Sequence, residues 1–305
     1  MNVSLYCSPT HLKLVVGSAD STAIKVDDYG AFPLPEGAMI NGIITDEEAM
    51  INYLSTIGAA MGGFKHEALL VIDANSIRSK VMDMPVVSGQ KMLEFIASDL
   101  GAFNEEGNND VFDYAVLNGK LPEGGARILA VAVDREILQV YRNTFSSAGF
   151  NLKGINIGVN ALIKLSRILP QLKTGARILA AVDDRNLTLS LFENGDYKIT
   201  NKYRLLNTES TPEWRQEIGN NISSVIQAHK GQRPVEDISA VFFAGLSPEE
   251  TESLTEPLAF LDIETDMLDV ASFINLTGKA AQNNGGFDPG QNLLNLGTLL
   301  KRQER

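Results

Sequence analysis

The chain has 305 residues, of which 44% are apolar, and 26 Lys and Arg side chains stand against 38 Asp and Glu, giving a net charge of −12. At about 150 residues per domain this length predicts two domains. An acidic chain with no basic cluster argues against nucleic acid or anionic lipid as a partner, because phosphate contacts need clustered cations. The single cysteine, the lack of a signal sequence at Met1 and apolar runs well short of the roughly 20 residues that span a bilayer predict a cytoplasmic protein.

The N-terminal region predicts a strand meander followed by a helix. Apolar segments over residues 3–7, 11–16 and 22–27 are separated by turn-forming residues, which is typical of a meander. The sequence from Thr45 to Glu48 matches a capping box, with Thr45 expected to cap a helix and Glu48 to reach back to it. The apolar face of that helix comprises Ala49, Met50, Tyr53, Leu54, Ile57 and Met61.

Residues 66–155 predict a small α+β subdomain inserted after this helix. Strands are expected over residues 68–73, 77–84, 112–117 and 127–133. One helix is expected from Ser88 and another over residues 137–145, where Gly149 ends it. A polar loop is expected at residues 104–110.

The second half repeats the order of meander and helices. A helix over 159–172 precedes strands at 177–182, 187–193 and 197–205, and Asn194-Gly195 predicts a hairpin turn. Helices are expected to begin after Thr211 and Ser247, each followed by a proline, with a buried strand over 239–244 between them. Residues 278–292 are expected to be mobile. The predicted divisions are 1–172, 173–290 and a basic amphipathic tail at 291–305.

No motif of metal or catalytic chemistry is found. The three histidines, His11, His66 and His229, are isolated in the sequence, and neither a dinucleotide-binding glycine motif nor a phosphate-binding loop occurs. The acidic run at 262–269 predicts a solvated surface, since it lacks the turn glycine of a calcium loop. No catalytic residue and no metal ligand is therefore expected.

The order of these elements carries a family resemblance. Two meanders, each followed by helices, with a subdomain inserted in the first half, resemble the actin-like (ribonuclease H-like) ATPase superfamily. Within it, the sequence resembles the PilM family of type IV pilus assembly proteins, and more distantly FtsA and the cytoplasmic part of GspL. The residues that carry the likeness lie at 34–46, 81–85, 112–117, 128–132, 147–150 and 160–162. The resemblance implies a two-domain α/β actin-like fold.

The departures from the superfamily pattern concern the nucleotide. The resemblance implies two Asp-x-Gly hairpins that would hold phosphate and magnesium. When Lys13 is aligned with the usual lysine of the first hairpin, Tyr6 replaces the aspartate and Ser8 the glycine. In the second hairpin, Ala181 replaces the aspartate and Asp183 the glycine.

The adenosine side departs as well. The Gly-Gly pair expected there is reduced to Ala244-Gly245, and Asp183 and Asp184 bring negative charge where phosphates would bind. We therefore expect no ATP, no Mg²⁺ and no catalysis.

The resemblance implies a non-catalytic scaffold at the inner face of the cell membrane that binds the N-terminal tail of a PilN-like membrane protein, through an Asn-Leu-Leu-Pro-type motif, beside the inserted subdomain. Asn292, Leu293, Leu294 and Asn295 resemble that motif and predict a docking segment in cis. The basic residues at 301–305 predict the flank of a fused membrane helix, and a homo-oligomer is a further expectation.

Alternatives remain open at this point. An ordinary terminal helix also explains residues 292–295. An active ATPase or small-molecule kinase with divergent loops, or an FtsA-like cell-division protein that forms filaments, also agrees with the predicted fold class.

Overall fold

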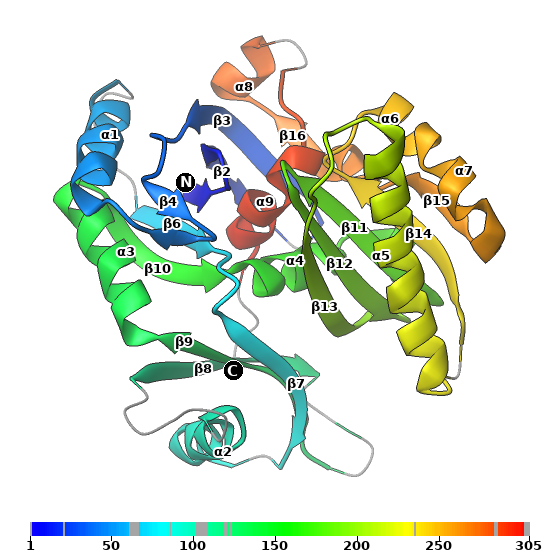
Figure 1. Cartoon of the computed structure of the whole chain (residues 1–305). Coiled ribbons are helices and arrows are strands. Elements are labelled where there is room, and N and C mark those ends of the chain that lie inside the picture. Colours follow the sequence, from blue (N-terminus) through cyan, green and yellow to red (C-terminus); the bar gives the residue numbers. More distant parts are fainter. Residues whose placement is uncertain are drawn as a thin grey trace. The chain divides into compact units, whose positions relative to one another are not determined.

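The computed structural model describes residues 2–20, 22–60, 67–85, 87–101, 109–118, 121, 124–234, 236–283 and 286–301 (Figure 1). The chain divides into two compact units. Unit 1 comprises Met1–Leu14, Ala31–Asn160 and Lys301–Arg305, and unit 2 comprises Val15–Gly30 and Ala161–Leu300. This division differs from the predicted boundary after residue 172, because the helix that precedes that boundary packs mainly with unit 2.

The largest sheet has the strand order β10-β6-β1-β2-β3-β16. Its strands are β1 (Asn2–Cys7), β2 (His11–Ala19), β3 (Ile24–Pro33), β6 (Glu67–Ile72), β10 (Asn151–Ile157) and β16 (Ile274–Leu276). In unit 1, β6 pairs in parallel with both β1 and β10. In unit 2, β16 pairs in parallel with β3. The predicted N-terminal strands are confirmed, whereas β10 and β16 were not predicted.

Besides α2 (Gly89–Gly101), which packs on a separate three-stranded sheet, the helices of unit 1 are α1 (Glu47–Ala60), α3 (Arg135–Ser147) and the first residues of α4 (Gly158–Ser166). The N-cap of α1 is Asp46, whose Oδ1 accepts a hydrogen bond from the Ala49 amide at 2.9 Å. The predicted cap, Thr45, is therefore wrong by one residue. Its hydroxyl instead donates to the carbonyl oxygen of Gly37 at 2.6 Å and closes the short hairpin of β4 (Met39–Ile40) and β5 (Ile43–Ile44).

A separate three-stranded sheet lies within unit 1, at the bottom of Figure 1. Its strands β7 (Arg78–Met84), β8 (Asp110–Asn118) and β9 (Ala126–Asp134) are antiparallel in the order β7-β9-β8. Helix α2 (Gly89–Gly101) covers one face, and the buried core there comprises Met92, Ile96, Leu100, Tyr114, Ala126, Ile128, Ala130 and Ala132. This region is shorter than the predicted 66–155, because β6 and β10 belong to the largest sheet; most of the predicted polar loop lies outside the described residues.

Unit 2 contains a five-stranded sheet in the order β13-β12-β11-β14-β15. The strands are β11 (Ala176–Asp183), β12 (Asn186–Glu193), β13 (Asp196–Arg204), β14 (Ile238–Ala244) and β15 (Glu264–Met267). Helix α5 (Pro212–Gly231) packs on one face through Trp214, Ile218 and Ile222, which are all buried. The predicted cap at Thr211 is confirmed. So is the capping box at the start of α6 (Pro248–Ser253), which is followed by α7 (Thr255–Leu258).

The C-terminal part of unit 2 forms helices and turns in its described residues, and the mobility predicted for 278–292 stays a prediction. It contains α8 (Gly278–Gln282), a 3-10 turn (Gly290–Asn292) and α9 (Leu293–Leu299). The Phe287 ring contacts the Tyr29 ring edge-on, with centroids 5.0 Å apart. In the parts of the chain that the structure describes, no helix combines the length and the apolar character needed to cross a bilayer.

Candidate functional site

The first predicted nucleotide hairpin, between β1 and β2, is closed by its own side chains. The Ser8 amide donates to the carbonyl oxygen of His11 at 2.8 Å, and the Ser8 hydroxyl accepts from the His11 amide at 3.0 Å. Tyr6 is buried opposite Val71 of β6, and Lys13 is buried in β2. This turn therefore offers no carboxylate at residue 6, and the Ser8 hydroxyl is engaged within the turn.

The second hairpin joins β11 to β12. Asp183 pairs with Asn186, so that the turn consists of Asp184 and Arg185, and Asp184 has a φ of 56°. Ala181 lies between Thr188 of β12 and Ala244 of β14. A methyl group therefore stands where a magnesium-binding carboxylate would be expected. Asp183 is half-buried at the predicted glycine position.

Carboxylates gather close to this second hairpin. Burial raises the pKa of Glu209, and the charges of Glu250 and Asp184 raise it further. Burial also raises the pKa of Glu250, but hydrogen bonds from Ser210 and Ser247 outweigh it, so that this pKa lies below its usual range. The mutual repulsion indicates a locally negative potential, which opposes a polyphosphate. Among the described residues, no three His, Cys, Asp or Glu side chains form a metal site.

The turn after β14 is covered by the chain itself. Gly245 has a φ of 83°, and a Cβ atom there would overlap the carbonyl oxygen of Val182. The side-chain amide of Gln291 donates to the Gly245 carbonyl oxygen at 2.5 Å. A Cβ atom on Gly290 would come within 2.9 Å of the Gly245 nitrogen.

A carboxylate holds the covering segment in place. The Oδ1 atom of Asp288 accepts hydrogen bonds from the amides of Gly290 and Gln291, at 2.8 and 3.3 Å. Gly290 and Gln291 therefore lie against the backbone of Gly245, the position to which the sequence resemblance assigns the adenosine. This close packing accounts for glycine at residue 245, so that a bound nucleotide is not needed to explain it.

The predicted docking segment is part of the core of unit 2. Asn292 ends the 3-10 turn, Leu293 and Asn295 are buried in α9, and Leu294 is half-buried. The Nζ of Lys164 donates to the carbonyl oxygens of Thr298 and Leu300, at 3.2 and 2.7 Å. The segment is therefore packed within unit 2 and is not a free tail, and the hypothesis that it docks in cis stays a prediction. Residues 302–305 of the predicted basic tail lie outside the described residues.

A surface feature that sequence reasoning missed is the hairpin of β4 and β5. Ile40 and Ile43 face each other across it, with 55% and 37% of their surfaces exposed. The turn between them is Asn41-Gly42, with φ angles of 51° and 76°. This dipeptide is the same hairpin signal that predicted the turn at 194–195 correctly, so the pattern was available in the sequence.

The chain resembles known proteins in its fold and not in its sequence. No family model matches the chain, and no curated protein matches its sequence. A chain of the PilM-PilN type IV pilus biogenesis complex superposes with a TM-score of 0.77 at 13% identity, covering 100% of this chain and 99% of that one. A Bacteroides thetaiotaomicron protein with an actin-like ATPase fold superposes with a TM-score of 0.56 at 10% identity, covering 90% and 92% of the two chains.

These likenesses establish the fold. The chain has the actin-like fold, and its predicted likeness to PilM is confirmed at that level. The cytoplasmic domain of Vibrio cholerae EpsL, an inner-membrane component of the type II secretion system, matches with a TM-score of 0.47 at 12% identity over 89% of this chain and 99% of that one.

Proposed function

We propose that this chain is a non-catalytic actin-like scaffold of a type IV pilus, or of a related secretion or competence machine. In this role it binds the cytoplasmic segment of a PilN-like membrane protein at the inner face of the membrane. The whole-length likeness to a chain of the PilM-PilN complex supports this choice among the many uses of the actin-like fold. The predicted homo-oligomer and fused membrane helix stay predictions.

The observation that carries the non-catalytic part is the contact of Gln291 with Gly245. A nucleotide at this turn would have to displace Gln291 and Gly290 from the backbone of residue 245. Hard cations such as magnesium need oxygen ligands, and the methyl group of Ala181 cannot serve as one. Phosphates near Asp184 would meet the negative charge that raises the pKa of Glu209.

Isothermal titration with Mg-ATP and Mg-ADP tests this part, together with an assay of phosphate release. We expect no binding at micromolar concentration and no hydrolysis. The matched variant is Gln291→Ala, which opens the contact at Gly245 but leaves Ala181 without a carboxylate, and it should also fail to bind. Micromolar binding by the unaltered chain would favour the ATPase or kinase alternative, and nucleotide-dependent polymers in a sedimentation assay would favour the FtsA-like one.

A two-hybrid assay tests the partner. The chain is paired with the cytoplasmic N-terminal segment of the PilN-like protein encoded in the same genome. Its control is the same segment with serine at each leucine. We expect interaction with the natural segment alone. Equal signals from both segments, or none from either, contradict the proposed partner.

A further inference from the structure

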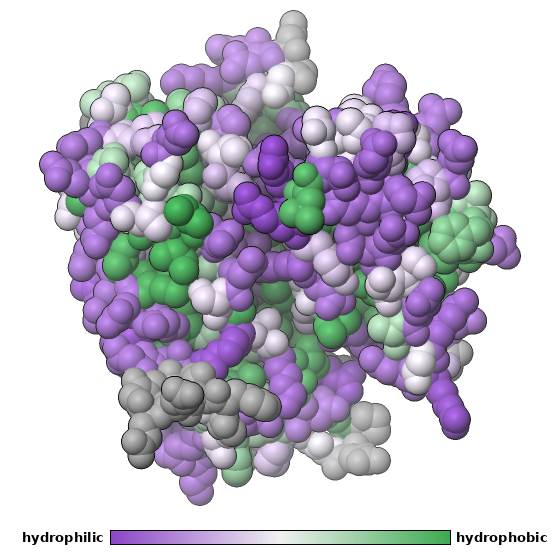
Figure 2. Space-filling model, in the orientation of Figure 1, coloured by the Kyte–Doolittle hydropathy of each residue, from purple (hydrophilic) through white to green (hydrophobic). Residues whose placement is uncertain are grey.

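The hairpin formed by residues 38–45 presents an apolar tip to solvent, and Figure 2 shows apolar surface over β4 and β5 on the left of the view. Ile40 and Ile43 form this tip. We propose that the hairpin docks a basic, apolar protein segment, such as the cytoplasmic flank of a membrane protein. This inference rests on the proposed function, since it describes the chemistry of the partner that such a scaffold would bind.

The hairpin is held rigidly by the rest of unit 1. The Tyr141 hydroxyl of α3 donates to the carbonyl oxygen of Gly42 at 2.9 Å. A Cβ atom on Gly42 would come within 2.7 Å of the Ala74 Cα, so the turn lies directly on the chain after β6. At the base, the Thr45 amide donates to the carbonyl oxygen of Ala38 at 2.9 Å. A surface fixed in this way loses little conformational entropy when a partner binds.

The two isoleucines of the tip are not the residues that anchor the hairpin in the core. Ala38 and Ile44 are buried and connect the hairpin to the core, at 1% and 6% exposure. Ile40 and Ile43 point away from that core. A polar side chain at either position would therefore leave the core contacts of Ala38 and Ile44 intact. Single exposed apolar residues are common, but two that face each other on a fixed turn form a continuous contact surface.

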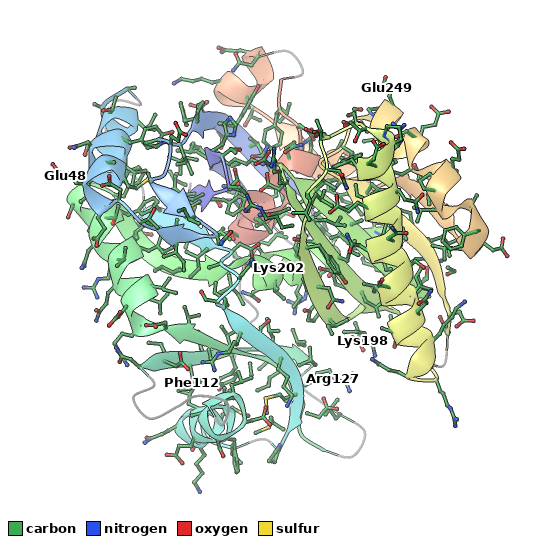
Figure 3. All side chains as sticks on the ribbon, viewed as in Figure 1. Glu48, Phe112, Arg127, Lys198, Lys202 and Glu249 are labelled. Carbon is green, nitrogen blue, oxygen red and sulfur yellow. The ribbon has the colours of Figure 1, made fainter. Side chains whose placement is uncertain are left out.

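The charge around the hairpin selects the occupant. The exposed residues beside its base include Glu36, Asp46, Glu47 and Glu48, and Figure 3 shows Glu48 on the outer side of α1. The sequence has no Lys, Arg or His between Lys25 and Lys65. Helix α3 packs against α1 and β5 and carries Arg135, Glu136 and Arg142 along its length.

An apolar pair bordered by carboxylates is complementary to a segment that combines apolar and basic residues. Cytoplasmic segments next to a membrane helix have this composition, since they carry an excess of Lys and Arg. A membrane surface is the poorer occupant, because its anionic lipids would be repelled by Glu36 and Glu47. A second copy of this chain would bring a net charge of −12 to the same acidic surface.

The test measures fluorescence anisotropy with a labelled peptide made only of leucine, isoleucine and lysine, at physiological ionic strength. A control peptide has the same sequence with glutamate in place of every lysine. We expect the lysine peptide to bind and the glutamate peptide not to bind. The double variant Ile40→Ser/Ile43→Ser should weaken binding about tenfold or more, since it removes two burial contacts. The variant Glu36→Gln/Glu47→Gln/Glu48→Gln should weaken binding and reduce its dependence on salt.

The matched control is Phe95→Ser/Leu206→Ser, which removes two exposed apolar side chains elsewhere, at 49% and 78% exposure. It should bind like the unaltered chain, and circular dichroism should show that every variant is folded. Equal binding by the isoleucine variant and the unaltered chain would overturn the proposal. The proposal would also be overturned if the unaltered chain formed a dimer, or adsorbed to phosphatidylserine vesicles, and only the isoleucine variant lost that property. Failure of the proposed function would appear separately, as Mg-ATP binding or loss of the two-hybrid signal.

Discussion

Gly297 of α9 packs directly against the backbone of Ala161 in α4, so closely that a Cβ atom on residue 297 would overlap the Ala161 carbonyl oxygen. Residue 297 is therefore glycine because two helices meet there without a side chain between them. The contact lies within unit 2 and is reinforced by Lys164 of α4, whose ammonium group donates to the carbonyl oxygens of Thr298 in α9 and of Leu300 directly after it.

Replacing this glycine should destabilise the chain. Gly297→Ala should lower the free energy of unfolding by about 3 kcal/mol, because the helices have to separate to accept one methyl group. Urea unfolding followed by circular dichroism measures the change. The control is Gly231→Ala at the end of α5, where an added Cβ atom meets nothing within 4 Å. That variant should be neutral, or more stable by up to about 1 kcal/mol, and an equal loss in both variants would contradict the explanation.

The turn at Gly245 allows two costs to be separated. Gly245→Ala introduces both a positive φ at a residue with a side chain and an overlap with Val182. Gly124→Ala introduces only the positive φ of 85°, with open space around it. We expect Gly124→Ala to lower the free energy of unfolding by about 1–2 kcal/mol and Gly245→Ala to lower it clearly more. Thermal unfolding of both variants measures the difference. Equal losses would mean that the Gly245 turn is not packed against Val182 as described.

The stability of unit 2 should depend on pH through Asp27. The Thr277 hydroxyl donates to Asp27 Oδ1 at 2.6 Å and lowers the pKa of that carboxyl; burial opposes the shift, and Lys25 at 3.0 Å adds to it. Because the folded-state pKa lies below the unfolded value, this stabilisation is complete above about pH 4 and is lost as the pH falls through the folded-state pKa.

Thr277→Val should therefore cost about 1 kcal/mol at neutral pH, and the difference from the unaltered chain should shrink at the acidic end. Urea unfolding across this range measures it. The double variant Asp27→Asn/Thr277→Val serves as the reference, since it should show no further pH dependence from this pair. A constant difference at all pH values would contradict the linkage.

Cys7 should react slowly with thiol reagents. Burial raises the pKa of its thiol to about 12, so that the reactive thiolate is scarce at neutral pH. We expect iodoacetamide to label the native chain only as unit 1 opens, and to label it rapidly in urea. The variant Cys7→Ala/Phe95→Cys moves the thiol to an exposed position on α2 and should react at once. Fast labelling of native Cys7 would show that β1 is accessible.

The sequence predicted the elements whose patterns are local. The caps at Thr211 and Ser247 and the turn at Asn194 depend on neighbouring residues and are confirmed. Strand β10 escaped prediction because Lys153 and Gly154 interrupt its apolar pattern. It exists through parallel pairing with β6, about 80 residues earlier in the chain.

In the candidate site, too, residues with a local sequence pattern could be predicted, and residues defined by contacts between distant segments could not. The strand positions of Tyr6 and Ala181 next to short turns could be predicted from the sequence, and their place in a nucleotide site stays a prediction. Gln291 could not, because its contact with Gly245 joins segments 46 residues apart. The amphipathic spacing of the leucines in α9 predicts a terminal tail. The burial of α9 on nearly all sides depends on Gly297, Thr298 and Asn295, which are small or polar and carry no such signal.

The discontinuous path of unit 2 has a consequence for synthesis on the ribosome. Residues 15–30 leave the exit tunnel early, yet their unit is complete only when the buried helix α9, ending at Leu299, has also emerged. Strand β3 must wait for its partner β16, about 250 residues later. Translation at about 5–20 residues per second makes this a delay of more than ten seconds. During that time the edge of β3 that pairs with β16 has no partner, and unpaired strand edges of this kind favour aggregation.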